Sequence, residues 1–308
     1  MVCQHGIKTT GRMEERALSM RAMKASLIAN TLIVIIKFFA WQKTGAISYL
    51  SGLCEVFFDW NVAVMNLIVM MMAHRPASAY YRYGYGKAES LGALVQVGIV
   101  VYGSGWLVWE SLERFANPQP IKEHFLGIML ILLSTVITVS LVFIQNKTLK
   151  KTDSPLVSSD AVHARGHLML NLGIMATLIF SYFDICPYVD PLFGVAVALY
   201  MVIASWKVMK SALGSLLDME APPHVRAQLE KIINSHKDVG GFHKLRTRYA
   251  GADLFIQVHV EMKGSMLLRE SHDIAHEIEE NILKEFPNAQ VVLHQDPIEE
   301  EEAHANEY

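Results

Sequence analysis

The 308-residue sequence contains only three cysteines, Cys3, Cys54 and Cys186, and they lie far apart. Their spacing matches no metal-binding or redox motif, so we expect no disulfide. Charged residues are also scarce, at 19% of the chain, and the net charge is −3. No long basic tract is present, so nothing in the sequence favours binding to nucleic acid.

The start of the chain lacks the features of a cleaved signal peptide. Residues 1–24 are polar and carry charges of both signs, without a short apolar core and a small-residue cleavage site. We therefore expect no cleaved signal peptide, and we assign residues 1–23 to a cytoplasmic N-terminal arm.

Apolar residues are abundant instead, at 52% of the chain, and the mean hydropathy is positive. Six apolar segments are long enough to cross a bilayer, for which about 20 residues are needed. They run over residues 24–44, 47–73, 89–114, 124–146, 157–182 and 190–213. The sequence therefore predicts a transmembrane domain of six helices over residues 24–214.

Basic residues in the short loops indicate the orientation of this domain. Lys and Arg gather in the N-terminal arm, between the second and third segments, and between the fourth and fifth. Because short loops rich in Lys and Arg remain in the cytoplasm, we expect both ends of the chain to be cytoplasmic.

Two pairs of ionisable residues interrupt the apolar segments. Glu55 and Asp59 lie in the second segment, and His163 and His167 lie in the fifth. The i, i+4 spacing places both members of a pair on one face of a helix. Since a carboxylate within a membrane costs at least about 2.5–3.5 kcal/mol, such pairs indicate a function. Together they are a ligand set for a divalent metal ion. Lys37, in the first segment, either reaches the surface or faces a polar cavity, and we assign it no role.

The mixture of oxygen and nitrogen ligands favours one class of metal. Four such ligands suit tetrahedral Zn²⁺, whereas Ca²⁺ and Mg²⁺ prefer oxygen ligands alone. Fe²⁺, Mn²⁺, Co²⁺ and Cd²⁺ are further candidates, because ligand type biases the choice without fixing it. Because metal and protons compete for the same ligands, the site predicts exchange of metal for protons.

Two other classes of function fit parts of this pattern. Residues 163–167 read HARGH, which resembles half of a zinc-protease motif but lacks the glutamate directly after the first histidine. An intramembrane metallohydrolase is therefore disfavoured. A transporter of an organic cation would use the carboxylates as counter-ions, and Phe57, Phe58 and Trp60 beside Asp59 keep this alternative open.

The remainder of the chain predicts a small cytoplasmic domain over residues 219–298, followed by an acidic tail over residues 299–308. Its predicted elements are a helix from Pro222 or Pro223 to about His236, strands Phe242–Tyr249 and Leu254–Met262, a helix over 269–286, and a strand Gln290–His294. This αββαβ order predicts an α/β domain in which antiparallel strands carry the helices on one face.

Several motifs, distributed over nearly the whole chain, carry a family resemblance. They are the acidic pair of the second segment, Gly84–Ser90 (GYGKAES), Asp160 with the two histidines, Leu217–Asp218, Leu245–Arg248 (LRTR), Phe255–His259 (FIQVH) and His294–Pro297 (HQDP). With these motifs the chain resembles the cation diffusion facilitator family of proton-coupled metal exporters, in particular its bacterial zinc and iron exporters. The resemblance implies a homodimer in the bacterial inner membrane, with a metallochaperone-like cytoplasmic domain, and no enzymatic activity.

The resemblance assigns the transport site to Glu55, Asp59, His163 and His167. The family usually has aspartates with one histidine at these positions, so Glu55 and His167 are departures. The second histidine removes a negative charge and softens the site, and we expect Zn²⁺ to be the preferred cargo with Fe²⁺ next. A metal-sensing or scaffold subunit without transport is an alternative that these departures support.

The resemblance also implies a metal site in the cytoplasmic domain. Its positions fall on His243, His259, His272, His294 and Asp296. In the family, two metals bridge the domains of two protomers there, so we expect Zn²⁺ to have a regulatory role as well. Lys87 and Asp218 match residues that form a charged interlock near the dimer interface.

Overall fold

The computed structural model describes residues 4–44, 47–116, 125–182 and 189–298. The chain divides into two units. One comprises Ala17–Leu213, and the other comprises Gly214–Tyr308 together with the start of the chain as far as Arg16. The first unit is helical, and the second contains a sheet covered by helices.

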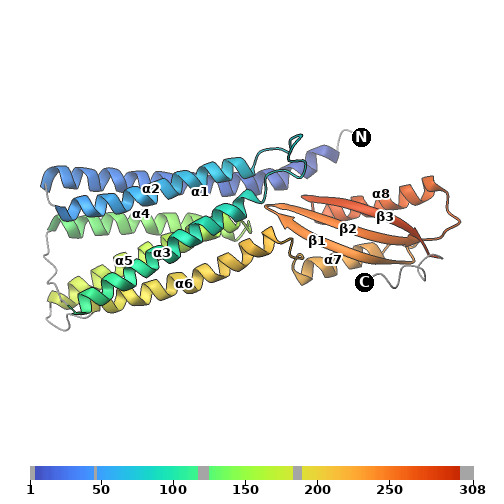
Figure 1. The fold of residues 1–308 in the computed structure, drawn as a ribbon. Coiled ribbons are helices and arrows are strands. Elements are labelled where there is room, and N and C mark those ends of the chain that lie inside the picture. Colours follow the sequence, from blue (N-terminus) through green and yellow to red (C-terminus); the bar gives the residue numbers. More distant parts are fainter. Residues whose placement is uncertain (1–3, 45–46, 117–124, 183–188, 299–308) are drawn as a thin grey trace. The chain divides into compact units, whose positions relative to one another are not determined.

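Six long helices precede the C-terminal domain (Figure 1): α1 (Gln4–Thr44), α2 (Ile47–Ala73), α3 (Ala88–Ala116), α4 (Phe125–Leu149), α5 (Pro155–Tyr182) and α6 (Val189–Leu216). Within the described residues, five of them are long and apolar enough to cross a membrane, over Glu14–Gln42, Glu55–Ala73, Ala88–Glu113, Ile128–Leu149 and Pro191–Leu216. Helix α5 is long enough, at 28 residues, but it carries Asp160, Arg165 and two histidines.

Helix α1 begins at Gln4, well before the predicted start of the first segment at residue 24. Its apolar stretch also begins earlier, at Glu14. Residues 4–23 contain no proline and several good helix formers, such as Met, Glu, Arg and Ala, so the helix continues through them. Much of the predicted N-terminal arm is thus an extension of the first helix.

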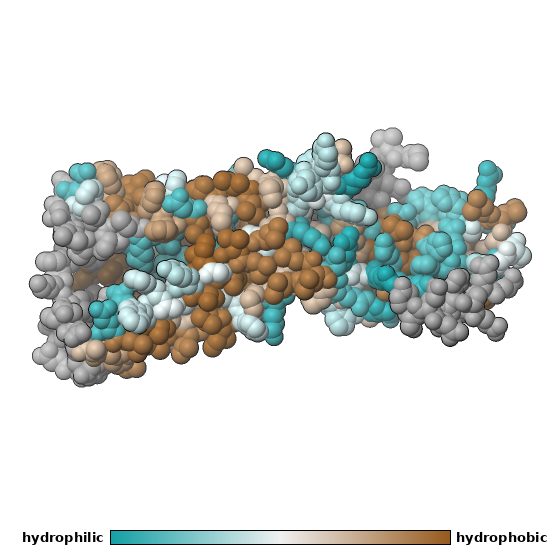
Figure 2. Space-filling view, in the orientation of Figure 1, coloured by the Kyte–Doolittle hydropathy of each residue, from teal (hydrophilic) through white to brown (hydrophobic). Residues whose placement is uncertain are grey.

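The outward side chains of the helical unit are largely apolar. Phe58, Trp106 and Phe143 are 75%, 63% and 70% exposed. Figure 2 shows hydrophobic side chains, in brown, over much of this unit. Such a surface is unfavourable in water and is expected where lipid chains surround the protein.

The C-terminal domain has the predicted αββαβ order. Its elements are α7 (Pro223–Asn234), β1 (Gly241–Ala250), β2 (Asp253–Met262), α8 (Leu268–Glu285) and β3 (Ala289–Pro297). Strand β2 lies in the centre of the sheet and pairs antiparallel with β1, as the hairpin predicted, but parallel with β3. The prediction of antiparallel strands was therefore wrong for β3. The reason is that α8 crosses over the sheet and returns the chain to the end where β2 begins.

The two helices of this domain share one hydrophobic core with the sheet. Leu229 of α7, Ile278 of α8 and Ile256 of β2 are almost completely buried in it. Because successive side chains of a strand point to opposite faces, His259 and Glu261 of β2 belong to the other face. The face opposite the core is therefore available for polar residues.

Candidate metal centres

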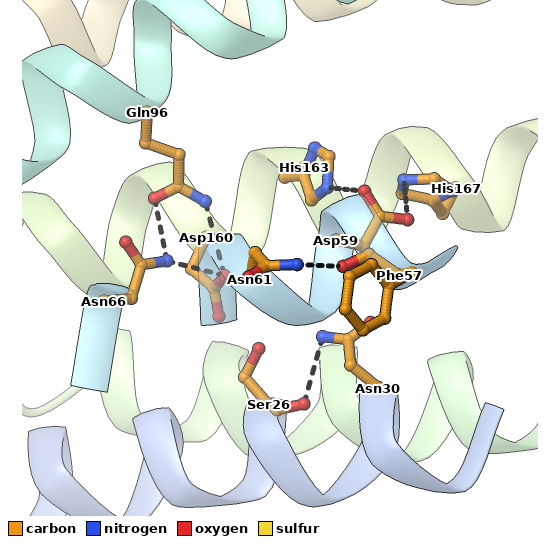
Figure 3. Close-up of polar contacts among 10 residues, drawn as sticks. All are labelled: Ser26, Asn30, Phe57, Asp59, Asn61, Asn66, Gln96, Asp160, His163 and His167. Atoms are coloured by element: carbon orange, nitrogen blue, oxygen red, sulfur yellow. Dashed lines mark hydrogen bonds and ion pairs between the residues drawn. The ribbon is translucent and has the colours of Figure 1, made fainter. Parts of the chain in front are cut away.

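Helices α2 and α5 bring three ionisable side chains together. Asp59 comes from α2, and His163 and His167 come from α5 (Figure 3). Oδ1 of Asp59 lies 3.1 Å from Nε2 of His163, and Oδ2 lies 3.3 Å from Nε2 of His167. Two ligands of a tetrahedral Zn²⁺ ion, each at the usual bond length, lie about 3.3 Å apart. The observed separations are therefore close to those that a shared ion requires.

The fourth predicted ligand, Glu55, lies outside this cluster. Among the described residues, Asp59, His163 and His167 offer ligand atoms within 4.8 Å of one another, and Glu55 does not join them. Glu55 is exposed, one turn before Asp59 on α2, and lines the same cavity as the cluster. Its role as a ligand stays a prediction.

A cavity of about 360 Å³ surrounds the cluster and is lined by residues from all six long helices. Besides Asp160, two charged lining residues were not assigned to the site from the sequence: Lys37 of α1 and Glu110 of α3. The signal for each was a charge within or beside an apolar segment. The sequence could not show that the two residues line the same space, because they come from helices far apart in the chain.

Asp160, one turn before His163, is buried and receives hydrogen bonds from three helices. Nδ2 of Asn66 and Nε2 of Gln96 donate to its Oδ1 over 3.2 and 3.3 Å (Figure 3), and Nε2 of Gln145 donates to its Oδ2 over 2.7 Å. All three amides are fully buried. These contacts satisfy the buried carboxylate with neutral donors and join α2, α3 and α4 to α5 beside the histidines.

The aromatic residues beside Asp59 are not part of the cavity. None of Phe57, Phe58 and Trp60 is among its described lining residues. Nε1 of Trp60 donates a hydrogen bond to Oγ1 of Thr31 over 3.0 Å, and its ring stacks on Phe57 with 5.7 Å between centroids. An aromatic cage around a bound organic cation would need these rings to face the carboxylates. Their placement weakens the organic-cation alternative.

The second cluster lies on the face of the sheet opposite the core. His243, His259 and His294 occupy directly paired positions on β1, β2 and β3. Oδ2 of Asp296 lies 2.8 Å from Nδ1 of His259 and 3.1 Å from Nε2 of His243, and its Oδ1 lies 3.1 Å from Nε2 of His294. Ligand atoms of His243, His259 and Asp296 lie within 4.8 Å of one another, so this donor set fits one transition-metal ion.

The imidazoles around Asp296 also determine its ionisation. Burial raises the pKa of Asp296, but the hydrogen bond from His259 and the charges of the neighbouring imidazoles lower it by more. The pKa of Asp296 therefore lies below its ordinary value. Because a carboxylate binds metal in its ionised form, Asp296 is ready to act as a ligand at neutral pH.

Glu261 is a member of this cluster that sequence reasoning missed. Its Oε1 lies 2.8 Å from Nδ1 of His243, and its side chain is largely buried. The contact engages Nδ1 of His243 and leaves Nε2 of the same ring facing Asp296. Carboxylates commonly orient metal-binding histidines in this way. The available signal was its position two residues after His259 in an alternating strand, which places both on one face.

His272 does not join this cluster within one copy of the chain. It belongs to α8, which packs on the other face of the sheet, and it is exposed. Its ring stacks with that of His276 at 6.5 Å between centroids. The role of His272 as a cytoplasmic ligand stays a prediction.

Asp218, of the predicted interlock, follows α6 with a positive φ of 55°. Nη1 of Arg248 donates a hydrogen bond to its Oδ1 over 2.8 Å. This contact connects two of the motifs noted in the sequence, Leu217–Asp218 and LRTR. Lys87 stands at the start of α3, in the other unit, and its pairing with Asp218 stays a prediction.

Two family profiles match nearly the whole chain. The cation efflux transmembrane domain matches residues 23–217, and the cytoplasmic domain of cation efflux proteins matches residues 221–298. The chain belongs to the cation efflux family. This finding confirms the family, also called cation diffusion facilitators, that the sequence motifs indicated.

Individual members of the cation efflux family are similar over most of their length. The cation-efflux pump FieF of Citrobacter koseri is 33% identical over 290 residues, which cover 94% of this chain and 95% of that protein. FieF of Cronobacter sakazakii is 34% identical over 282 residues, covering 92% and 93%. Among solved structures, the zinc form of CzrB is 30% identical, with 27% of this chain and 96% of that chain covered and a TM-score of 0.24. The metal-bound C-terminal domain of CzcD from Thermotoga maritima is 22% identical, covers 24% and 88%, and also has a TM-score of 0.24.

Membership of the cation efflux family establishes the general function. The chain is an integral membrane protein with several spans, and it is a transporter for the efflux of divalent metal cations, not an enzyme. The metallohydrolase alternative is thereby excluded.

Proposed function

We propose that this member of the family is a homodimer that exports Zn²⁺, with Fe²⁺ as its next cargo, from the cytoplasm of a bacterium in exchange for protons. The observation that carries the proposal is the cluster of Asp59, His163 and His167 within a cavity between membrane helices. Its mixed oxygen and nitrogen ligands suit Zn²⁺ and Fe²⁺ better than Ca²⁺ or Mg²⁺.

The hydrogen bonding of the cluster supports coupling to protons. A carboxylate accepts hydrogen bonds, so the short contacts of Asp59 require a hydrogen on Nε2 of His163 and of His167. A metal ion that binds these nitrogens must displace those hydrogens. A neutral imidazole keeps its hydrogen by moving it to Nδ1, whereas a doubly protonated imidazole loses one proton when the metal binds. Metal binding to a protonated histidine is thus expected to expel a proton, and protonation to expel the metal.

The position of the cavity supports release on the extracytoplasmic side. Lys37, Glu110 and Asn171 line it from the C-terminal halves of α1, α3 and α5. By the distribution of Lys and Arg in the loops, those ends of the helices are the extracytoplasmic ones. This arrangement is the one expected of an exporter whose site is open toward the outside.

The cytoplasmic cluster supports regulation by the same metal. His243, His259, His294 and Asp296 are held by the sheet, and His272 is displayed on a helix of the same domain. A second copy of the chain would supply His272 to the cluster, so that a bound ion joins the two copies. Rising cytoplasmic Zn²⁺ would then stabilise one arrangement of the dimer.

The test is metal-driven proton flux in proteoliposomes, with Zn²⁺, Fe²⁺, Mn²⁺ and Cd²⁺ compared. We expect the largest flux for Zn²⁺, and we expect Asp59→Ala to abolish flux for every metal, because it removes both carboxylate contacts of the histidines. Glu113→Ala, which removes an exposed carboxylate of α3 outside the cavity, is the matched control and should retain the parent's flux.

The sensor or scaffold alternative predicts no flux for any metal. If the parent protein is folded and dimeric but transports none of the four metals, transport is refuted and the sensor function is favoured. If flux persists in Asp59→Ala, the protein transports through another site.

A further inference from the structure

The cavity around the transport cluster contains a lysine side chain. Lys37 lines it together with the carboxylates of Glu55, Asp59, Glu110 and Asp160. The lysine is half-buried and lies within the apolar stretch of α1, where an ammonium group is costly. An ionisable residue that faces a cavity between membrane helices commonly belongs to an ion pathway.

Acidic side chains outnumber lysine among the described residues that line the cavity. Glu55, Asp59, Glu110 and Asp160 share it with Lys37, so the cavity favours a cation. Lys37 shares this cavity with the ligands Asp59 and His167. In the empty cavity Lys37 therefore supplies part of the positive charge that the metal supplies when it is bound.

The same ammonium group opposes metal binding. Two positive charges within one cavity repel each other. A transported ion must bind well enough to enter its site and weakly enough to leave it. The long, flexible stem of lysine allows its charge to move toward the carboxylates when the metal is absent and away when it is present.

We propose that Lys37 is a tethered cation of the transport cycle, which neutralises the carboxylates of the empty site and lowers its metal affinity so that the metal is released. The proposal rests on the transport function proposed above. It assigns Lys37 a role in release and turnover, although Lys37 is not itself a metal ligand.

The test compares Zn²⁺ binding and Zn²⁺ transport in three variants of the full-length protein. All carry His259→Ala, so that binding reports the membrane site. Lys37→Met removes the charge and keeps an unbranched chain, Lys37→Arg keeps the charge, and Glu110→Gln removes a negative charge from the same cavity. Binding of Zn²⁺ is measured by calorimetry in nanodiscs, transport in proteoliposomes, and thermal stability alongside.

We expect Lys37→Met to bind Zn²⁺ about tenfold more tightly and to turn over more slowly, because a repulsive charge has been removed. Lys37→Arg should stay close to the parent, and Glu110→Gln should bind more weakly. A purely structural role of Lys37 would weaken binding and lower stability, so tighter binding separates the two explanations.

Unchanged or weaker Zn²⁺ binding in Lys37→Met would overturn the proposal while leaving the transport function intact. The His259→Ala protein is also compared with the same protein carrying Asp59→Ala. If neither binds Zn²⁺ at the membrane site, the transport site itself is refuted, and the proposal with it.

Discussion

At the scale of single residues, both clusters use a carboxylate placed between imidazoles. Asp59 contacts His163 and His167 in the membrane unit, and Asp296 contacts His259 and two further histidines in the cytoplasmic domain. Each carboxylate holds its histidines close to the spacing that a metal needs. Binding then requires little ordering of side chains, which preserves affinity.

The contact between Glu261 and His243 allows this preorganisation to be tested. Glu261→Gln should weaken Zn²⁺ binding at the cytoplasmic cluster by about tenfold or more, because the carboxylate that orients His243 is lost. Calorimetric titration of the full-length protein carrying Asp59→Ala reports this cluster alone.

Glu277→Gln is the matched control for that substitution. Glu277 also contacts a histidine, since its Oε2 lies 3.1 Å from Nε2 of His236, but it is exposed and lies outside the cluster. Equal Zn²⁺ affinities of the two variants would show that Glu261 does not orient a ligand.

At the scale of elements, α5 depends on polar contacts for its position. Asp160→Asn keeps the shape of the side chain but replaces one accepting oxygen with an amide donor, which faces either the donor of Gln145 or those of Asn66 and Gln96. We expect the unfolding free energy to fall by about 1–3 kcal/mol, because buried donors lose their acceptor. A lower midpoint of thermal unfolding in detergent would be the measurement.

Asp153→Asn provides the comparison for Asp160→Asn. It makes the same chemical change at an exposed position before α5, and its unfolding midpoint should equal that of the parent. An unchanged midpoint in both variants would mean that the buried hydrogen bonds contribute nothing to the stability of the helical unit.

Local patterns in the sequence predicted the parts of the structure that depend on local spacing. The i, i+4 spacing placed His163 and His167 together on α5, and apolar periodicity and turn residues predicted the αββαβ order. Contacts between distant segments were not predictable in this way. Glu110 in the cavity, the amides around Asp160, and the parallel pairing of β3 all depend on how whole elements pack.

At the scale of the whole molecule, the proposed dimer makes the cytoplasmic site dependent on two copies. His272→Ala should abolish the increase in dimer affinity that Zn²⁺ produces, because the ligand that reaches across is missing. His276→Ala, one turn further along the same exposed face of α8, should leave that increase intact. Fluorescence energy transfer between labelled copies, with and without Zn²⁺, measures the effect.

A Zn²⁺-dependent increase in dimer affinity that persists to the same extent in both variants would refute the bridging role of His272. Loss of the response in both would point to damage of α8, which the far-ultraviolet circular dichroism of each variant would reveal.

The paired positions of His243, His259 and His294 have a consequence for biosynthesis. A slip of one residue between two strands would turn the histidines of one strand toward the hydrophobic core and separate the ligands. A metal ion that binds the cluster would therefore stabilise only the chain whose strands are correctly aligned. When metal accumulates in the cell, the ion would increase the fraction of newly made exporter that is correctly folded.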